Sequence, residues 1–149
     1  MASRNGRPAG AADGAARIRL GRMVEDGVSP SFFGLVERGI ARDPELAAQM
    51  RGRVVFRFAE DFSPVRIIFK PRSVVVEDGD SRKPDLVIAG RLPDIVHFAT
   101  VPTLRGRLHG VPDPRRARGR AALRRLAGGR VKIEGDRVLG RRLLRLLAV

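Results

Sequence analysis

The stretch from Gly52 to Gly90 limits the fold of this chain more than any other feature of its sequence. It reads GRVVFRFAEDFSPVRIIFKPRSVVVEDGDSRKPDLVIAG, which is four short apolar runs separated by turn residues. Apolar and polar side chains alternate within the runs, as they do in strands that bury one face. The connections are too short for crossover helices, so the runs predict four strands with mostly antiparallel pairing.

The remaining apolar patterns predict helices and one further strand. Val131 and Ile133 alternate with Lys132 and Glu134, which indicates a fifth strand. Helices are expected from Ser29 or Ser31, from Pro44, after Leu92, over 115–127 and from Asp136 to the end of the chain. The sequence therefore predicts an α+β fold in which helices cover a five-stranded, mostly antiparallel sheet.

The chain of 149 residues is long enough for one domain with a hydrophobic core. Residues 1–28 are rich in Ala, Gly and Arg and show no sustained period, so we expect a flexible arm there and a folded domain over 29–149. The sequence has no cysteine, no apolar signal region at its N-terminus and no apolar run of about 20 residues, the length that a membrane span needs. A cytoplasmic location is the resulting expectation.

Positive charge is concentrated in the last third of the chain. The formal net charge is +14, and residues 99–149 carry fourteen basic and three acidic residues, a net of +11. The segment 101–128, called the basic segment below, holds eight arginines, including Arg107, against one acidic residue, Asp113. A set of arginines from this segment and the closing helix is the candidate site for an anionic surface: Arg115, Arg116, Arg118, Arg120, Arg124, Arg125, Arg141, Arg142 and Arg145.

The closing helix is strongly amphipathic when it is projected at about 100° per residue. Five leucines fall in one arc, and four arginines fall in the opposite one: Leu139, Leu143, Leu144, Leu146 and Leu147 against Arg137, Arg141, Arg142 and Arg145. The apolar arc can cover a sheet or an enclosed ligand. The arginine arc has two interpretations, a solvated face or a surface that meets the phosphate head groups of an anionic membrane.

The order of these elements resembles the sterol carrier protein type-two family. The most specific matches are KPDLVIAG, in which Pro84 and Asp85 enter the fourth strand, and GRVKIEGD, which runs from Gly129 to Asp136 before the leucine-rich helix. The resemblance covers about residues 31–149, apart from the basic segment, which looks longer and more basic than the corresponding link. It implies helices and a five-stranded sheet around an apolar tunnel that binds fatty acyl, sterol-like or isoprenoid lipids without covalent chemistry. Related bacterial domains are accessory lipid-binding factors in isoprenoid quinone synthesis.

Large apolar side chains on the predicted strands and helices are the candidates for lining such a tunnel. They are Phe56, Phe58, Ile67, Phe69, Ile88, Phe98, Leu143 and Leu147. The same pattern describes an ordinary packed core, and both interpretations stay open at the level of sequence. Burial of an apolar ligand contributes about 25 cal/mol per Å², so a lipid chain needs little polar anchoring.

No catalytic constellation is recognisable in the sequence. The two histidines, His97 and His109, have no partner at the spacing of a metal site or a catalytic triad, and the phosphate-binding and nucleophile motifs are absent. We therefore expect no enzyme, no cofactor and no metal. The expected partners are an apolar lipid, an anionic membrane surface, and a lipid-processing enzyme or acidic protein.

Two alternatives from other classes remain. Nonspecific nucleic-acid binding fits the local charge, although no aromatic residue follows Phe98 to stack on bases. A scaffold domain that has lost its cavity is the second alternative.

Overall fold

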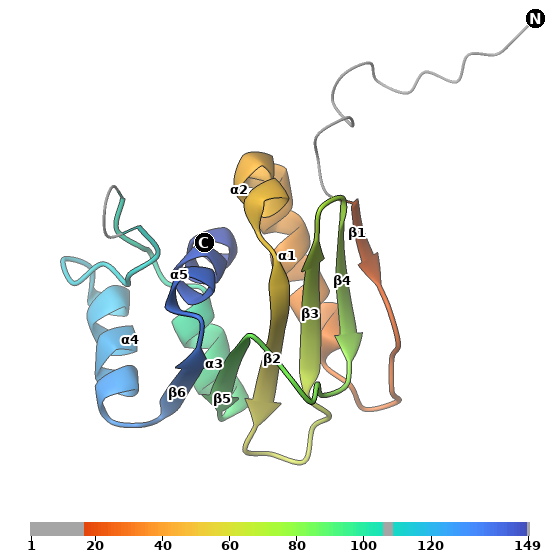
Figure 1. The fold of residues 1–149 in the computed structure, drawn as a ribbon. Coiled ribbons are helices and arrows are strands. Elements are labelled where there is room, and N and C mark those ends of the chain that lie inside the picture. The colour runs from red at the N-terminus through yellow and green to blue at the C-terminus, as the bar shows by residue number, and fades with distance from the viewer. Residues whose placement is uncertain (1–16, 106–108, 149) are drawn as a thin grey trace, which may run out of the picture.

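The computed structural model describes residues 17–105 and 109–148, which form a six-stranded sheet with helices on one side (Figure 1). The spatial order of the strands is β1-β4-β3-β2-β5-β6. Their bounds are β1 Arg17–Leu20, β2 Gly52–Phe58, β3 Val65–Lys70, β4 Ser73–Asp78, β5 Leu86–Gly90 and β6 Val131–Gly135. The helices are α1 Ser29–Arg42, α2 Pro44–Gln49, α3 Leu92–Ala99, α4 Ala117–Ala127 and α5 Arg137–Leu147.

The predicted α+β class is confirmed, but the predicted five-stranded, mostly antiparallel sheet is wrong in strand number and in pairing. The sixth strand is β1, which pairs in parallel with β4. With only four residues, β1 is too short for its alternation to stand out in the sequence. The second parallel pair is β2 with β5, because the chain leaves β4 and crosses to the free edge of β2 instead of turning back as a hairpin.

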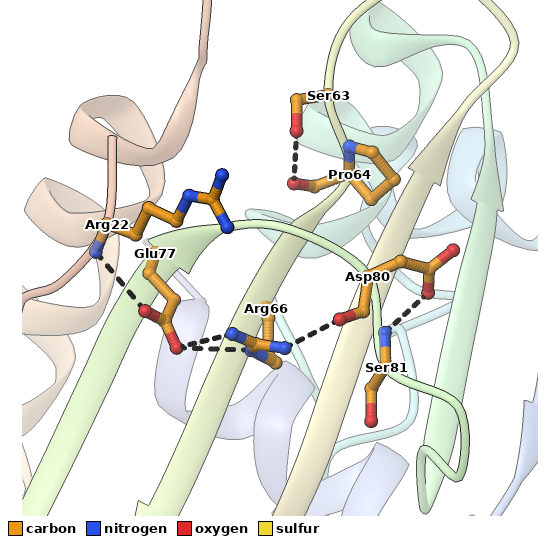
Figure 2. A network of polar contacts seen from close by, with 7 residues as sticks. All are labelled: Arg22, Ser63, Pro64, Arg66, Glu77, Asp80 and Ser81. Carbon is orange, nitrogen blue, oxygen red and sulfur yellow. Dashed lines mark hydrogen bonds and ion pairs between the residues drawn. The ribbon is translucent and has the colours of Figure 1, made fainter. Parts of the chain in front are cut away.

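A polar network on the open face of the sheet holds the crossing link 79–85 in place (Figure 2). Arg66 on β3 donates to the Glu77 carboxylate at 2.8 Å and to the backbone carbonyl of Asp80 at 2.6 Å. The Asp80 carboxylate pairs with Arg57 on β2 at 3.1 Å. Partial burial alone would raise the pKa of Glu77, but the hydrogen bonds from Arg66 and from the Arg22 backbone outweigh it and lower the pKa. The link therefore crosses β3 and β2 as part of the fold.

The inner face of the sheet and the helices share one hydrophobic core. Alternate residues on each strand point to this face, and α1, α3 and α5 pack against it. The buried residues of the inner face are Val54, Phe56, Val65, Ile67, Phe69, Val74, Val76, Leu86, Ile88 and Val131. All five leucines of the predicted apolar arc of α5 are buried as well, which confirms the projection.

The two sequence motifs that carry the family resemblance meet at the junction of β5, β6 and α5. The Asp85 carboxylate accepts from the Arg53 N–H at 2.8 Å, and its carbonyl accepts from the Asp136 N–H at 2.8 Å. Gly135 has a φ of +114°, and a Cβ there would lie 2.2 Å from the Asp85 carbonyl oxygen. Asp136 then caps α5 by accepting from the Leu139 N–H at 3.1 Å. These motif residues direct the chain from the sheet into the helix.

The buried carboxylate of Asp78 fastens the link between β1 and α1 to β4. Asp78 is 1% exposed and accepts from the Val24 N–H at 3.0 Å, the Ser29 N–H at 3.2 Å and the Ser29 hydroxyl at 3.0 Å. Ser29 is the first residue of α1, and Asp78 holds it there. It is therefore not the N-cap that its residue type predicts. Residues 17–28 belong to the fold, so the predicted arm over 1–28 is too long; residues 1–16 lie outside the described residues.

We predict that Asp78→Ala lowers the free energy of unfolding by about 3 kcal/mol, because it leaves buried N–H and hydroxyl groups without an acceptor. Thermal or denaturant unfolding measures the loss. Asp80→Ala is the matched control, since its carboxylate is 49% exposed and an exposed ion pair contributes less than about 1 kcal/mol. Equal losses in the two variants would contradict the anchoring role of Asp78.

Candidate functional site

The eight residues predicted to contact lipid lie together in the core. Seven of them are at most 3% exposed, and Phe58 is partly buried at the edge of the same cluster. The structure therefore brings these residues together, as a tunnel and a packed core would both require. Their contact with a lipid stays a prediction.

Phenylalanines form a chain of ring contacts from the core toward the end of β2. The ring centroids of Phe32 and Phe56 are 4.6 Å apart, those of Phe32 and Phe58 5.9 Å, and those of Phe58 and Phe62 6.2 Å. Phe32 comes from α1, is fully buried and was not among the predicted site residues. Its helical spacing to Val36 indicated a buried position, but spacing alone could not indicate which strand it meets.

Helix α5 covers the core and is fastened at its end to α1. A Cβ at Gly39 would lie 2.2 Å from the carbonyl oxygen of Leu146, so only a glycine allows the two helices to approach this closely. Arg42 donates to the carbonyls of Leu146 at 2.8 Å, Arg145 at 3.2 Å and Ala148. Carbonyls in the last turn of a helix have no donor within the helix, so Arg42 satisfies them.

The contact line between α1 and α5 contains a small cavity, and we call this line the α1/α5 seam. The cavity measures about 70 Å³ and is lined by Leu35, Arg38, Gly39, Arg42, Leu146, Leu147 and Ala148. Its walls are largely apolar, and the core leucine Leu147 is one of them. The seam therefore places a buried core leucine beside a small surface cavity.

A much larger cleft, of about 1110 Å³, opens beside the end of the seam. We call it the arginine cleft, because five arginines line it: Arg42, Arg105, Arg115, Arg116 and Arg145. The ends of α1 and α5 form one side of the cleft, and residues 102–105, 109 and 113–116 of the basic segment form the other. A Cβ at Gly110 would lie 1.9 Å from the Arg141 carbonyl oxygen, so this loop packs directly on α5.

Two aspartates in the arginine cleft are paired with arginines. The Asp43 carboxylate lies 3.3 Å from Arg145, and the Asp113 carboxylate lies 3.1 Å from Arg115. The hydrogen bond from the Arg115 side chain lowers the pKa of Asp113 and raises that of Arg115. Both carboxylates therefore have a positive partner inside the cleft.

The nine arginines predicted to form one anionic-surface site are divided among three places. Arg115, Arg116 and Arg145 line the arginine cleft, Arg141 and Arg142 are half-buried on α5, and the other four lie on α4. Three of the α4 side chains make contacts within the fold: Arg118 with the Thr100 carbonyl, Arg120 with the Pro114 carbonyl, and Arg125 with Asp94.

Sequence reasoning missed two arginines of the cleft as site residues. In the sequence, Arg42 stands out only as a basic residue at the end of a predicted helix, and Arg105 only as one arginine of the basic segment. Neither has a spacing to the other cleft residues that a sequence pattern could reveal. Their proximity follows from the packing of the basic segment on α5.

Residues 17–105 and 109–148 contain no candidate metal-binding cluster. No group of three or more His, Cys, Asp or Glu side chains lies close enough there to hold a metal ion. His97 on α3 has a buried Nδ1 atom with no hydrogen-bond partner among the described residues. Burial lowers the pKa of His97, and the positive charges of Arg125 and Arg118 lower it further. None of the described helices is long and apolar enough to cross a membrane.

The fold is that of the sterol carrier protein 2 domains, whose structures are the neighbours of this chain. A structure named "UbiJ-SCP2 Ubiquinone synthesis protein" matches with a TM-score of 0.53 and 12% identity over 80% of this chain and 88% of that chain. The sterol carrier protein domain 2 of Helicoverpa armigera matches with a TM-score of 0.53 and 21% identity over 87% of this chain and 91% of that one. Comparison with protein-family models and with curated protein sequences finds no match. The resemblance read from the sequence is thus confirmed for the fold.

We predict that His97→Gln reduces the loss of stability between about pH 7 and pH 5.5. The folded-state pKa of His97 is below its ordinary value of 6.5, so protonation favours the unfolded chain and the free energy of unfolding falls as the pH drops through 6.5. Glutamine does not titrate, so the variant loses less. Denaturant unfolding at several pH values measures this difference, and equal slopes for the two proteins would contradict it.

Proposed function

We propose that this chain binds an apolar lipid without covalent chemistry, in the core between the inner face of the sheet and α5. The observation that carries the proposal is the position of α5. Its leucine face closes the core, and its end is held to α1 by contacts that involve few residues, Gly39 and Arg42 among them. The names of two structures with the same fold, a sterol carrier protein domain and a ubiquinone synthesis protein, support a lipid of the fatty acyl, sterol-like or isoprenoid class.

Entry of a lipid into this core requires α5 to move away from α1. The residues proposed to contact the lipid are at most 3% exposed, apart from Phe58, so the closed structure offers them no surface for a ligand. A lipid that takes the place of the α5 leucines covers the apolar surface of the core that those leucines covered. Burial of apolar surface contributes about 25 cal/mol per Å². The exchange of one apolar surface for another makes an internal tunnel energetically accessible once the α1/α5 seam opens.

The proposed role is to carry the lipid or to present it to a lipid-processing enzyme, and not to transform it. Neither histidine has a partner at the spacing of a catalytic triad in the sequence, and no group of three or more His, Cys, Asp or Glu among the described residues could hold a metal ion. The side chains of Asp78, Asp85 and Asp136 accept hydrogen bonds that hold the framework of the fold together.

A saturable titration of lipid-free protein with a fluorescent fatty acyl probe tests this proposal, and the chain's lack of Trp and Tyr keeps the protein's own emission low. We expect stoichiometric binding. We further predict that Arg42→Gln releases the probe several-fold faster, because each charged hydrogen bond lost at the end of α5 contributes about 1.5–3 kcal/mol. Stopped-flow dilution measures the release rate.

Arg82→Gln is the control, since Arg82 is exposed on the link 79–85 and does not line the seam or the arginine cleft. An absence of saturable binding would overturn the lipid-binding proposal and leave the scaffold alternative. Normal binding with the same release rate in Arg42→Gln would overturn only the role of α5 as the moving cover.

A second part of the proposal is that α4 docks the protein on an anionic membrane or an acidic partner. Arg120 and Arg124 are exposed on α4, and Leu126 on the same helix is 39% exposed. An arginine near a charged membrane contributes about 1 kcal/mol, and an exposed leucine adds apolar contact. No aromatic residue follows Phe98, so the same surface has no stacking platform for single-stranded nucleic acid.

We predict that Arg120→Glu with Arg124→Glu weakens binding to vesicles containing phosphatidylglycerol by about tenfold or more, because at least two favourable charges of about 1 kcal/mol each are lost. Vesicle co-sedimentation measures the change. Arg17→Glu with Arg19→Glu makes the same change in net charge on β1 and should have a smaller effect. Equal weakening would show that total charge, and not α4, governs the association.

A further inference from the structure

The arginine cleft keeps positive charge after its internal ion pairs are counted. Its five arginines face two aspartates, and each aspartate is already paired, Asp43 with Arg145 and Asp113 with Arg115. Arg42 donates to the end of α5. Arg105 and Arg116 are exposed and have no side-chain ion pair or hydrogen bond within the part of the chain that the structure describes. These two guanidinium groups are available to an anion.

The shape of the cleft strengthens this charge. Like charges gathered in one concavity with low-dielectric walls focus the field and repel each other, and an anion relieves that repulsion. The cleft has apolar walls, which include Pro102, Leu104 and Pro114. A convex surface with the same arginines would be better screened by solvent and salt.

The arginine cleft adjoins the α1/α5 seam. Arg42 and Ala148 line both of them, and the buried leucines Leu146 and Leu147 line the seam. A charged site thus adjoins an apolar cavity whose walls include core leucines. An amphiphile with an anionic head and an apolar chain matches this arrangement along its whole length.

We propose that the arginine cleft binds the phosphate group of an anionic lipid whose apolar chain enters along the α1/α5 seam, an inference that rests on the proposed lipid binding. The planar guanidinium fork of arginine pairs with two oxygens of a carboxylate or a phosphate at once, and a phosphate offers a further oxygen to a second arginine. A phosphate ester carries about two negative charges at neutral pH, which suits the surplus charge of the cleft. The ligand class is therefore a phosphorylated lipid and not a neutral one.

Competition against the fluorescent acyl probe tests the inference with two ligands of equal chain length, dodecyl phosphate below its micelle concentration and dodecanol. We expect dodecyl phosphate to compete at a concentration about tenfold or more below that of dodecanol, as a charged hydrogen bond contributes about that factor. Arg105→Gln with Arg116→Gln should abolish this preference and leave dodecanol unchanged. Arg130→Gln with Arg137→Gln removes the same charge outside the cleft and should keep the preference.

Thermal unfolding confirms that each variant is folded, and the outcomes separate the two proposals. Equal competition by dodecyl phosphate and dodecanol overturns the phosphate inference and leaves lipid binding in place. The same loss of preference in both double variants overturns the cleft as the site and assigns the effect to net charge. If inorganic phosphate alone protects the cleft arginines from chemical modification and neither amphiphile competes with the probe, the inference of an amphiphilic ligand is overturned. The cleft is then a site for free phosphate.

Discussion

Burial of the leucine face of α5 is the interaction on which the rest of the structure depends. Leu143 and Leu147 belong to the same core cluster as Phe56 and Ile88, so the last helix of the chain completes a core that the strands begin. The opposite face of α5 is rich in arginine, which directs the leucines inward because charged side chains are costly to bury without partners. The same helix forms the α1/α5 seam and contributes Arg145 to the arginine cleft, so closure of the core and formation of the proposed binding surfaces are one packing event.

The residues that carry the family resemblance hold the framework together. Asp85 joins β2, β5 and the start of α5 through its carboxylate and carbonyl, and Asp136 caps the helix that closes the core. Gly135 lets β6 approach Asp85 closely. Few positions direct the chain in this way while many only need to be apolar, so a fold can be shared at identities as low as the 12% and 21% found here.

The arginines of this chain divide between structural and available groups. Arg42, Arg66 and Arg125 satisfy carbonyls or carboxylates in the fold, whereas Arg105 and Arg116 face the arginine cleft. A large net charge therefore says little about function until each guanidinium is assigned a partner. Gly110 of the basic segment packs on α5, and described residues of the segment line the arginine cleft beside the proposed lipid entrance. That position connects its charge to the lipid-binding proposal.

The sequence by itself determined the features that depend on local periodicity. The alternation in β2 and β3, the leucine arc of α5 and the cap formed by Asp136 were predictable, because each involves residues within a few positions of one another. Only the tertiary structure decided that β1 joins β4, that β5 runs parallel to β2, and that Arg42 meets Arg145 across 103 positions of the chain. Such contacts depend on which buried surfaces fit together in space, and a linear pattern carries no record of that fit.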